Sequence, residues 1–311
     1  MTVAVLCGGV GAARFLRGLV HVVDPASVTA IVNVGDDTEL HGLHVSPDID
    51  TVVYTLADAI DPDRGWGLAG ETWQAMEMLG RYGNPTWFNL GDRDLATHIV
   101  RTERLRAGGS LSEATAHEAR SWELGLRVLP VTDDRLRTMV TVDEGTAHRE
   151  IGFQEYFVAR QHAVAVRAVR FDGAESATPA PGLLDALAGA GTVVIAPSNP
   201  IVSIGPVLAV PGVRDAVTAR RADTVAISPI VGGAALKGPA DRMLVELGHE
   251  SSVVGIARLY APLASTLVID TVDAQHADAV EAEGMRCVVT ETVMSTADRA
   301  ASLATAVLER P

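Results

Sequence analysis

The chain has 311 residues, of which 48% are hydrophobic and only 4% are aromatic. A chain of this length can bury one large core and still carry an insertion. Its 25 basic and 39 acidic residues give a net charge of −14, which argues against a broad nucleic-acid or anionic-membrane surface. We therefore expect no nucleic-acid or membrane partner, although a local basic pocket for a small phosphate remains compatible with this charge.

The two cysteines, Cys7 and Cys287, lie in the short apolar runs VAVLC and MRCVV, which are typical of buried strands. Buried thiols are favoured here over a disulfide or a nucleophile, and they suit a reducing compartment. The N-terminus has no basic segment before an apolar stretch, and no apolar run approaches the roughly 18 residues of a membrane span. The sequence predicts a cytoplasmic protein.

The chain opens with a strand, a glycine turn and a helix. Thr2 to Cys7 is apolar, residues 8–14 read GGVGAAR, and apolar side chains recur at helical spacing from Phe15 to Val23. Glycines let backbone amides approach an anion, and a helix N-terminus adds partial positive charge. Arg14 stands where a dinucleotide fingerprint has its third glycine, and no P-loop Gly-Lys-Ser/Thr follows. The turn indicates phosphate binding without naming a nucleotide; the alternative is a packing turn.

An acid-rich loop follows the second expected strand, Val28–Val34. It contains Asp36, Asp37 and Glu39, with two histidines shortly after. In an open parallel sheet, ligands bind outside the carboxyl ends of the strands, where this loop and the glycine turn both lie. Oxygen-rich clusters suit a hard cation such as Mg²⁺. We predict a metal-assisted site for a phosphate-bearing ligand.

A helix start closes the acid loop, with Ser46 as N-cap and Pro47 at the first helical position. Asp48 and Asp50 follow, and two residues apart on a helix they point in different directions. At most one of them should face the same ligand as Asp36. We expect Asp50 to do so and Asp48 only to favour the helix dipole.

The next hundred residues read as loops and helices. Residues 61–70 form a turn-rich loop and Glu71–Tyr82 is helical; the nearby tryptophans Trp66 and Trp73 either pack in the core or offer a flat surface to a ring-bearing substrate. In the motif GDRDLATH at residues 91–98, Asp92 is expected to cap the following helix. Helical structure should then continue to about Arg127. Asp94 and His98 are spaced to pair at i and i+4. This motif is explained either by helix capping or by function.

An antiparallel excursion is predicted after a strand at Val128–Thr132. Met139–Asp143 and Thr146–Ile151 flank Glu144-Gly145, which is a two-residue hairpin signal. Phe153–Arg160 reads as a short amphipathic helix, and Val164–Val169 as a strand. We expect one domain over residues 1–311, with an inserted β-hairpin plus helix at about residues 133–165.

The last third alternates strands with helices. The expected strands are Thr192–Ala196, Thr224–Ser228, Leu267–Asp270 and Cys287–Thr290, and a final helix runs from Met294 to Leu308. This alternation implies right-handed crossovers and a parallel sheet. The predicted fold class is α/β: a Rossmann-like open, mostly parallel sheet with helices on both faces and a smaller inserted helical and antiparallel subdomain.

Two strand exits in this last third are unusual. APSNPIVSIGP at residues 196–206 places Ser198 and Asn199 between prolines, and SPIVGG at 228–233 exposes the amides of Gly232 and Gly233, with Lys237 shortly after. Both read either as loops at the ligand edge or as rigid turns.

Over nearly its whole length the chain resembles the 2-phospho-L-lactate transferase family, whose actinobacterial members act as phosphoenolpyruvate transferases in coenzyme F(420) biosynthesis. The resemblance rests on GGVGAARFL, NVGDD, HGLHVSPDIDTVVYTLA, LGDRDLATH, FQEYFV, APSNPIVSIGP and SPIVGG. It implies that the terminal ribityl hydroxyl of the deazaflavin Fo (7,8-didemethyl-8-hydroxy-5-deazariboflavin) attacks the phosphate next to the enolpyruvyl or lactyl group of a guanosine diphosphate-linked donor. GMP would leave, and dehydro coenzyme F(420)-0 or coenzyme F(420)-0 would form.

The resemblance also implies roles for particular residues. Mg²⁺ would be the cofactor, with Asp36, Asp37 and Asp50 as its ligands and with Asp37 and Asp50 as catalytic residues. The implied contacts of Fo are Asp50, Asn89, Arg93 and His98. The implied contacts of the donor are Gly9, Val10, Gly11, Ala12, Arg14, Ser198, Asn199, Gly232 and Gly233. Some relatives carry a lysine in place of Asn89, and a homodimer is implied by the resemblance alone.

Two other functions fit parts of the sequence. An NAD(P) oxidoreductase would use the opening strand, glycine turn and helix, but Arg14 and the acid loop argue against it. A nucleotide-sugar-binding regulatory protein of related fold would share the glycine turn and would need neither the acid loop nor the GDRD motif.

Overall fold

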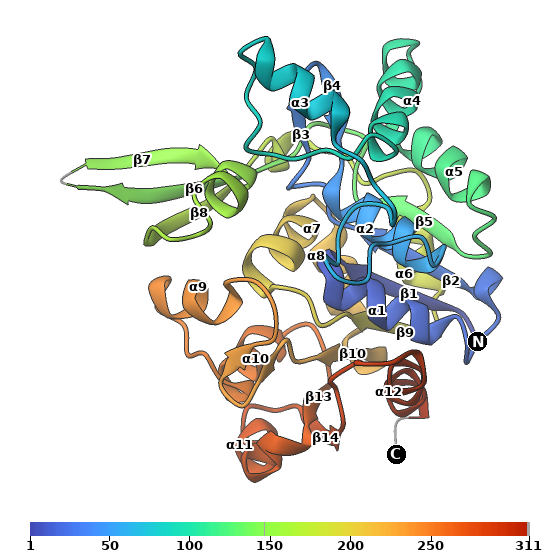
Figure 1. Ribbon diagram of the computed structural model, residues 1–311. Helices are drawn as coiled ribbons and strands as arrows, with labels where there is room; N and C mark the ends of the chain where they lie inside the picture. The colour runs from blue at the N-terminus through green and yellow to red at the C-terminus, as the bar shows by residue number, and fades with distance from the viewer. Residues whose placement is uncertain (146, 310–311) are drawn as a thin grey trace.

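The centre of the molecule is a seven-stranded parallel sheet with the strand order β14-β13-β10-β9-β1-β2-β5 (Figure 1). The structure is a computed structural model that describes residues 1–145 and 147–309. The sheet strands are β1 (Val3–Cys7), β2 (Val28–Val32), β5 (Arg127–Pro130), β9 (Thr192–Ile195), β10 (Thr224–Ile227), β13 (Thr266–Asp270) and β14 (Arg286–Thr290). Its inner strands are buried along their length, as expected where helices cover both faces of a parallel sheet. The predicted α/β fold class is confirmed.

Helices connect these strands. They are α1 (Gly9–Leu19), α2 (Pro47–Leu56), α3 (Gln74–Arg81), α4 (Asp94–Arg106), α5 (Leu111–Ser121), α6 (Leu183–Gly189), α7 (Gly205–Ala209), α8 (Val213–Ala219), α9 (Ala240–Glu246), α10 (Val253–Tyr260), α11 (Ala277–Ala282) and α12 (Ala297–Glu309). Helix α1 packs against α2 and α12, and α8 packs against α6 and α7. The chain leaves β1 toward β2 and leaves β9 toward β10, in opposite directions across the sheet. Right-handed crossovers therefore place α1 and α8 on opposite faces.

The strand order reverses between β1 and β9, which are neighbours in the sheet. In doubly wound folds the ligand crevice opens at this reversal, outside the carboxyl ends of the strands. The glycine turn follows β1, the acid loop follows β2, and residues 196–199 follow β9. The fold thus brings the loops selected from the sequence to one edge of the sheet.

A separate three-stranded antiparallel sheet projects from the body of the molecule (Figure 1). It consists of β6 (Arg137–Glu144), β7 (Ala147–Gly152) and β8 (Val166–Asp172). The predicted excursion therefore extends past the hairpin to include β8, which pairs with β6. The helix expected at Phe153–Arg160 is present over residues 153–159, of which Glu155–Ala159 is π-helical. Thr146 of the expected hairpin lies outside the described residues.

Two features between β2 and β5 differ from the sequence analysis. The acid loop contains a small hairpin of β3 (Thr38–Leu40) and β4 (Leu43–Val45), whose turn is His41-Gly42 with φ angles of 52° and 75°. The helical tract expected to reach Arg127 is two helices, α4 and α5. They separate because Ser110 forms a capping box with Glu113 and so starts a new helix.

The remaining short elements lie in the connections. The antiparallel pair β11 (Ile230–Val231) and β12 (Ala234–Ala235) follows β10. The 3₁₀ turns are Pro25–Ser27, Ala174–Ser176, Arg221–Asp223 and Thr271–His276, and a second π-helical turn is Pro200–Ile204.

Burial and hydropathy bear on two further predictions. Cys7 is fully buried as predicted, and burial raises the pKa of its thiol; Cys287, on edge strand β14, is only half-buried, and burial raises its pKa to about 11. Within residues 1–145 and 147–309, no single helix is long and apolar enough to cross a membrane. Two consecutive helical segments, Pro200–Ala209 and Val213–Ala219, are long and apolar enough when taken together, but the chain bends by 97° between them.

Candidate active site

The glycine turn is shaped by close contacts as well as by backbone angles. Gly9 begins α1 with a φ of 73°. A side chain at Gly8 would place its Cβ 2.5 Å from Asp48 Oδ2, and one at Gly11 would place its Cβ 2.4 Å from the carbonyl oxygen of Pro197. Helix α2 and the loop after β9 therefore press against this turn, and only glycine fits at both positions.

Asp48 ties the glycine turn to the end of β2. Its Oδ1 accepts the backbone N–H of Gly9 at 2.8 Å, and its Oδ2 accepts from Asn33 Nδ2 at 2.9 Å. Burial raises the pKa of Asp48 to about 6, against the opposing effect of these two hydrogen bonds. The sequence analysis gave Asp48 only a helix start, and the structure corrects this by placing its side chain at the sheet edge.

Asp36 and Asp37 lie beside Asp48 at this edge. Burial raises the pKa of Asp36 well above its ordinary value, and the neighbouring Asp48 carboxylate raises it further. Burial also raises the pKa of Asp37, whose Oδ2 accepts from Ser46 Oγ at 2.7 Å and lies 2.9 Å from His44 Nε2. Within the described ranges, Oδ1 of both Asp36 and Asp37 is buried without a hydrogen-bond partner.

Asp36 and Asp37 each leave one buried oxygen available to a hard cation. These two oxygens lack a donor, and no arginine or lysine of the described chain forms an ion pair with Asp36, Asp37 or Asp48. Buried unpaired carboxylates cost free energy unless a cation neutralises them. We call Asp36, Asp37 and Asp48 the acid edge.

A cavity of about 180 Å³ is lined by two members of the acid edge, Asp36 and Asp37. The acid loop forms one wall, and the other comes from the antiparallel excursion and from Trp87. The lining residues are Gly35, Asp36, Asp37, Thr38, Trp87, Arg137, Thr138, Gly152, Phe153, Gln154 and Glu155. The sequence analysis did not connect the excursion with the site, because no local signal reports which surface a projecting hairpin packs against.

Asp50 faces a second cluster instead of the acid edge. Both of its oxygens contact the guanidinium of Arg101, whose Nη2 also donates to Glu118 Oε2 at 2.8 Å. Arg101 is only 2% exposed. The structure thus places Asp48 beside Asp36, whereas Asp50 contacts Arg101. The expected contact of Asp50 with the ligand stays a prediction. Of the three predicted metal ligands, Asp36 and Asp37 each have an unpartnered oxygen, whereas both oxygens of Asp50 contact Arg101. Their roles as ligands stay predictions.

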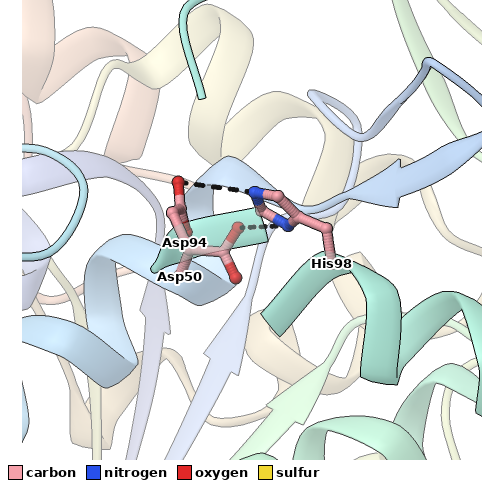
Figure 2. Close-up of side chains that lie close together, drawn as sticks. All are labelled: Asp50, Asp94 and His98. Atoms are coloured by element: carbon pink, nitrogen blue, oxygen red, sulfur yellow. Dashed lines mark ion pairs between the residues drawn. The ribbon is translucent and has the colours of Figure 1, made fainter. Parts of the chain in front are cut away.

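His98 completes this second cluster. Figure 2 shows dashed lines from its ring to two carboxylates, with Nε2 3.4 Å from Asp94 Oδ2 and Nδ1 3.8 Å from Asp50 Oδ2. One possible ligand atom from each of the three residues lies within 4.8 Å of the others. However, Arg101 Nη1 lies 3.4 Å from His98 Nδ1 and already provides the positive charge against Asp50.

We therefore interpret this cluster as an ion-pair network between α2, α4 and α5. Its members are Asp50, Asp94, His98, Arg101 and Glu118, and we call it the arginine network. The predicted i and i+4 pairing of Asp94 with His98 is confirmed. His98 is fully buried inside it. The sequence analysis missed Arg101 and Glu118 as members, although both lie on helical patterns next to the GDRDLATH motif.

The predicted donor residues divide into two groups. Ser198 Oγ donates to the Gly8 carbonyl at 2.8 Å and accepts the Gly8 N–H, while Asn199 Oδ1 accepts the Ile201 N–H at 2.9 Å. The Gly232 N–H donates to Asp273 Oδ2 at 2.9 Å. Ser198, Asn199 and the Gly232 amide therefore brace loops. The other predicted donor residues are Gly9, Val10, Gly11, Ala12 and Arg14 at the start of α1 and Gly233 in the β11–β12 turn.

Asn89 and Arg93 are both exposed, in the segment that follows Trp87. Arg93 Nη1 donates to the carbonyl oxygen of Ala69 at 2.7 Å. The expected capping by Asp92 of the helix that follows is wrong, because Asp92 accepts N–H groups at the start of α3 and Glu71 does the same for α4. The two loops cap each other's helices.

The two tryptophans of this region pack around an arginine. The guanidinium carbon of Arg64 lies 5.4 Å from the ring centre of Trp66 and 5.0 Å from that of Trp73. Trp66 is 41% exposed, so it is not a core residue.

Comparison with known proteins agrees with this geometry. The family model described as 2-phospho-L-lactate transferase CofD matches residues 3–308. The chain belongs to this transferase family. It is 47% identical to the phosphoenolpyruvate transferase of Streptomyces griseus over 99% of this chain and 98% of the relative. It is 45% identical to that of Kitasatospora aureofaciens, over 98% of this chain and 96% of the relative.

The fold of this transferase is shared with a more distant solved structure. Protein BH3568 from Bacillus halodurans superposes with a TM-score of 0.64 at 18% identity, covering 99% of both chains. The resemblance found in the sequence motifs is therefore confirmed at the level of the family, and the chain is a phosphoenolpyruvate or 2-phospho-L-lactate transferase by membership.

Proposed function

We propose that this transferase moves an enolpyruvyl-phosphate group, or a 2-phospho-L-lactyl group, from a guanosine diphosphate-linked donor to the terminal ribityl hydroxyl of Fo. GMP leaves, and dehydro coenzyme F(420)-0 or coenzyme F(420)-0 forms. Family membership supports the reaction class, and the names of the actinobacterial relatives favour the enolpyruvyl donor. The observation that carries the proposal is the acid edge beside the glycine turn.

The donor phosphates are proposed to bind the first turn of α1. Transfer of a phosphoryl group depends mainly on positioning and on neutralising oxygen charge. Positioning would come from the backbone amides after Gly9. Neutralisation would come from the α1 dipole and the exposed Arg14. Asp48 supports this arrangement because its hydrogen bond to Gly9 fixes the orientation of the turn.

The proposed Mg²⁺ would be held by Asp36 and Asp37, next to Asp48. Their unpartnered oxygens support this assignment. When bound there, the ion neutralises charge on the phosphate and leaving-group oxygens. Asp37 stays oriented by Ser46 and His44, so one of its oxygens remains directed away from these partners.

The acceptor is proposed to enter through the cavity that Asp36 and Asp37 line. Trp87 and Phe153 line it with aromatic side chains, which suit a ring-bearing molecule. The exposed Asn89 and Arg93 are retained as proposed Fo contacts. The contacts predicted for Asp50 and His98 stay predictions, since both side chains face the arginine network.

The proposal is tested by incubating the purified chain with Mg²⁺, Fo and either the enolpyruvyl or the lactyl guanylated donor, and measuring GMP. GMP release with one donor and its loss in EDTA are expected. As a matched control, Asp278→Asn removes an exposed carboxylate on α11 and should leave GMP release unchanged. Absence of GMP with both donors would contradict the proposal. Light scattering during gel filtration tests the proposed homodimer.

A further inference from the structure

Lys237 is the only lysine in the 311-residue sequence, and every other residue of the Lys and Arg class is an arginine. It follows the β11–β12 turn and precedes Gly238, which has a φ of 74°. This stretch leaves the carboxyl end of β10, and only β9 separates β10 from β1 in the sheet. The single lysine is thus carried on a loop at the ligand edge.

Lys237 connects the two halves of the chain across this edge. Its Nζ donates to the carbonyl oxygen of Arg64 at 3.4 Å, in the loop between α2 and α3. A Cβ at Gly65 would lie 2.5 Å from Nζ, so the absence of a side chain there leaves room for the ammonium group. A loop from the C-terminal half therefore touches a loop from the N-terminal half.

Arg14 provides a second positive charge next to Lys237. Burial lowers the pKa of the Lys237 ammonium, and the positive charge of Arg14 lowers it further. Arg14 is an exposed residue of α1, six positions after Gly8 of the glycine turn. Despite a net charge of −14, neither Lys237 nor Arg14 forms an ion pair with a carboxylate of the described residues.

The existing contacts leave Lys237 able to bind an anion. An ammonium group has three N–H donors, and one long bond to a carbonyl uses a single donor. Arg64 does not compete for the same role, because its guanidinium pairs with Asp61 at 2.8 Å and contacts two indole rings. The positive charges of Lys237 and Arg14 have no counter-ion among the described residues and lie beside helix amides. This arrangement favours the binding of a multiply charged phosphate.

We propose that Lys237 binds the diphosphate group of the donor, together with Arg14 and the first turn of α1. The inference rests on the proposed function, because it presupposes a nucleoside diphosphate donor. When the donor binds, the ammonium group exchanges the Arg64 carbonyl for a phosphate oxygen. The loop at residues 232–238 is then held over the crevice, and Lys237 is the residue through which the C-terminal half of the fold contacts the donor phosphates.

Calorimetric titration with GDP and with guanosine tests this inference. Lys237→Met should weaken GDP binding by about tenfold, as expected for one lost charge-assisted hydrogen bond. Guanosine binding should not change, and Lys237→Arg should retain part of the GDP affinity. Arg286→Met is the matched control, since it removes the same charge from the far edge strand β14. GDP affinity of Lys237→Met within twofold of the unmodified chain overturns the role of Lys237, whereas failure of the unmodified chain to bind GDP overturns the proposed donor itself.

The single lysine permits a second measurement on the unmodified chain. Lys237 carries the only side-chain amine in the sequence, so an amine-acylating reagent reports on it, with the α-amino group of Met1 in the purified chain as an internal control. GDP should slow the acylation of Lys237 without changing that of Met1, as read by peptide mass spectrometry. Equal acylation rates at Lys237 with and without GDP contradict the proposal.

Discussion

Two buried clusters of carboxylates lie next to each other in this transferase, and they are neutralised in different ways. In the arginine network, Arg101 contacts Asp50 and Glu118, and His98 lies between Asp50 and Asp94. On the acid edge, Asp36, Asp37 and Asp48 receive hydrogen bonds from neutral or histidine donors, and two of their oxygens receive none.

The difference separates a structural cluster from a reactive one. Arg101 supplies a fixed positive charge to Asp50 and Glu118, so ion pairs join the three helices of the arginine network. The acid edge has no arginine or lysine partner among the described residues, and burial raises the pKa of Asp36, Asp37 and Asp48. Burial also raises the pKa of Glu118, although Arg101 opposes this shift. The acid edge, which has no fixed counter-ion, is therefore the cluster that we propose to bind the cation.

The largest expected effect is on the arginine network. Arg101→Met leaves Asp50 and Glu118 buried without their counter-ion, and it should lower the free energy of unfolding by about 3–5 kcal/mol in urea denaturation. The control is Arg81→Met, whose partner Glu77 and own side chain are 64% and 66% exposed. That surface pair should contribute less than about 1 kcal/mol. Equal losses for the two variants would contradict the comparison.

On the acid edge, the expected loss is in turnover instead of stability. Asp36→Asn should reduce GMP release by about a hundredfold, because it removes a proposed metal ligand. It should not lower the free energy of unfolding of the metal-free chain, since it also removes an uncompensated buried charge. The GMP assay and urea denaturation in EDTA together check this prediction. If Asp36→Asn retained GMP release but had a lower free energy of unfolding, the role of Asp36 would be structural.

Asp50→Asn decides to which cluster Asp50 belongs. If Asp50 serves the arginine network, its loss should cost about 2 kcal/mol of unfolding free energy and reduce turnover less than Asp36→Asn does. The family resemblance implies the opposite pattern, with turnover abolished and the fold spared. Measuring both quantities on the same preparation separates the two outcomes.

The smallest expected effect is a pH dependence of the acid edge. The pKa of Asp48 is raised from 3.8 to about 6 in the folded chain. Its contribution to stability is therefore full below pH 3.8 and is lost as the pH rises through about 6. Between pH 5 and pH 7.5 in EDTA, the free energy of unfolding should fall by about 1.4 kcal/mol more than in Asp48→Asn. If the free energy of unfolding changes equally with pH in the unmodified chain and in Asp48→Asn, the pKa of Asp48 is not raised. Adding Mg²⁺ should reduce the difference between the two chains.

The fold was predictable wherever a segment is buried along its whole length. The apolar runs of β1, β9 and β10 are uninterrupted, and their alternation with helices was enough to indicate a parallel sheet. The β3–β4 hairpin was missed because its strands have three residues each and carry polar side chains. Such strands are specified by their turn and by the surface they cover, which short sequence windows do not contain.

By itself, the sequence determined the sheet, the meeting of the glycine turn with the acid loop at its edge, and the family. Tertiary structure alone decided which carboxylates act together. Asp48 and Asp50 are equivalent in a sequence pattern that reports only a helix start. Arg101, which pairs with Asp50, is 51 residues further along the chain. The physical reason is that a charge is neutralised by whatever group lies closest in space, and only the packing of α2 against α4 and α5 brings that group into place.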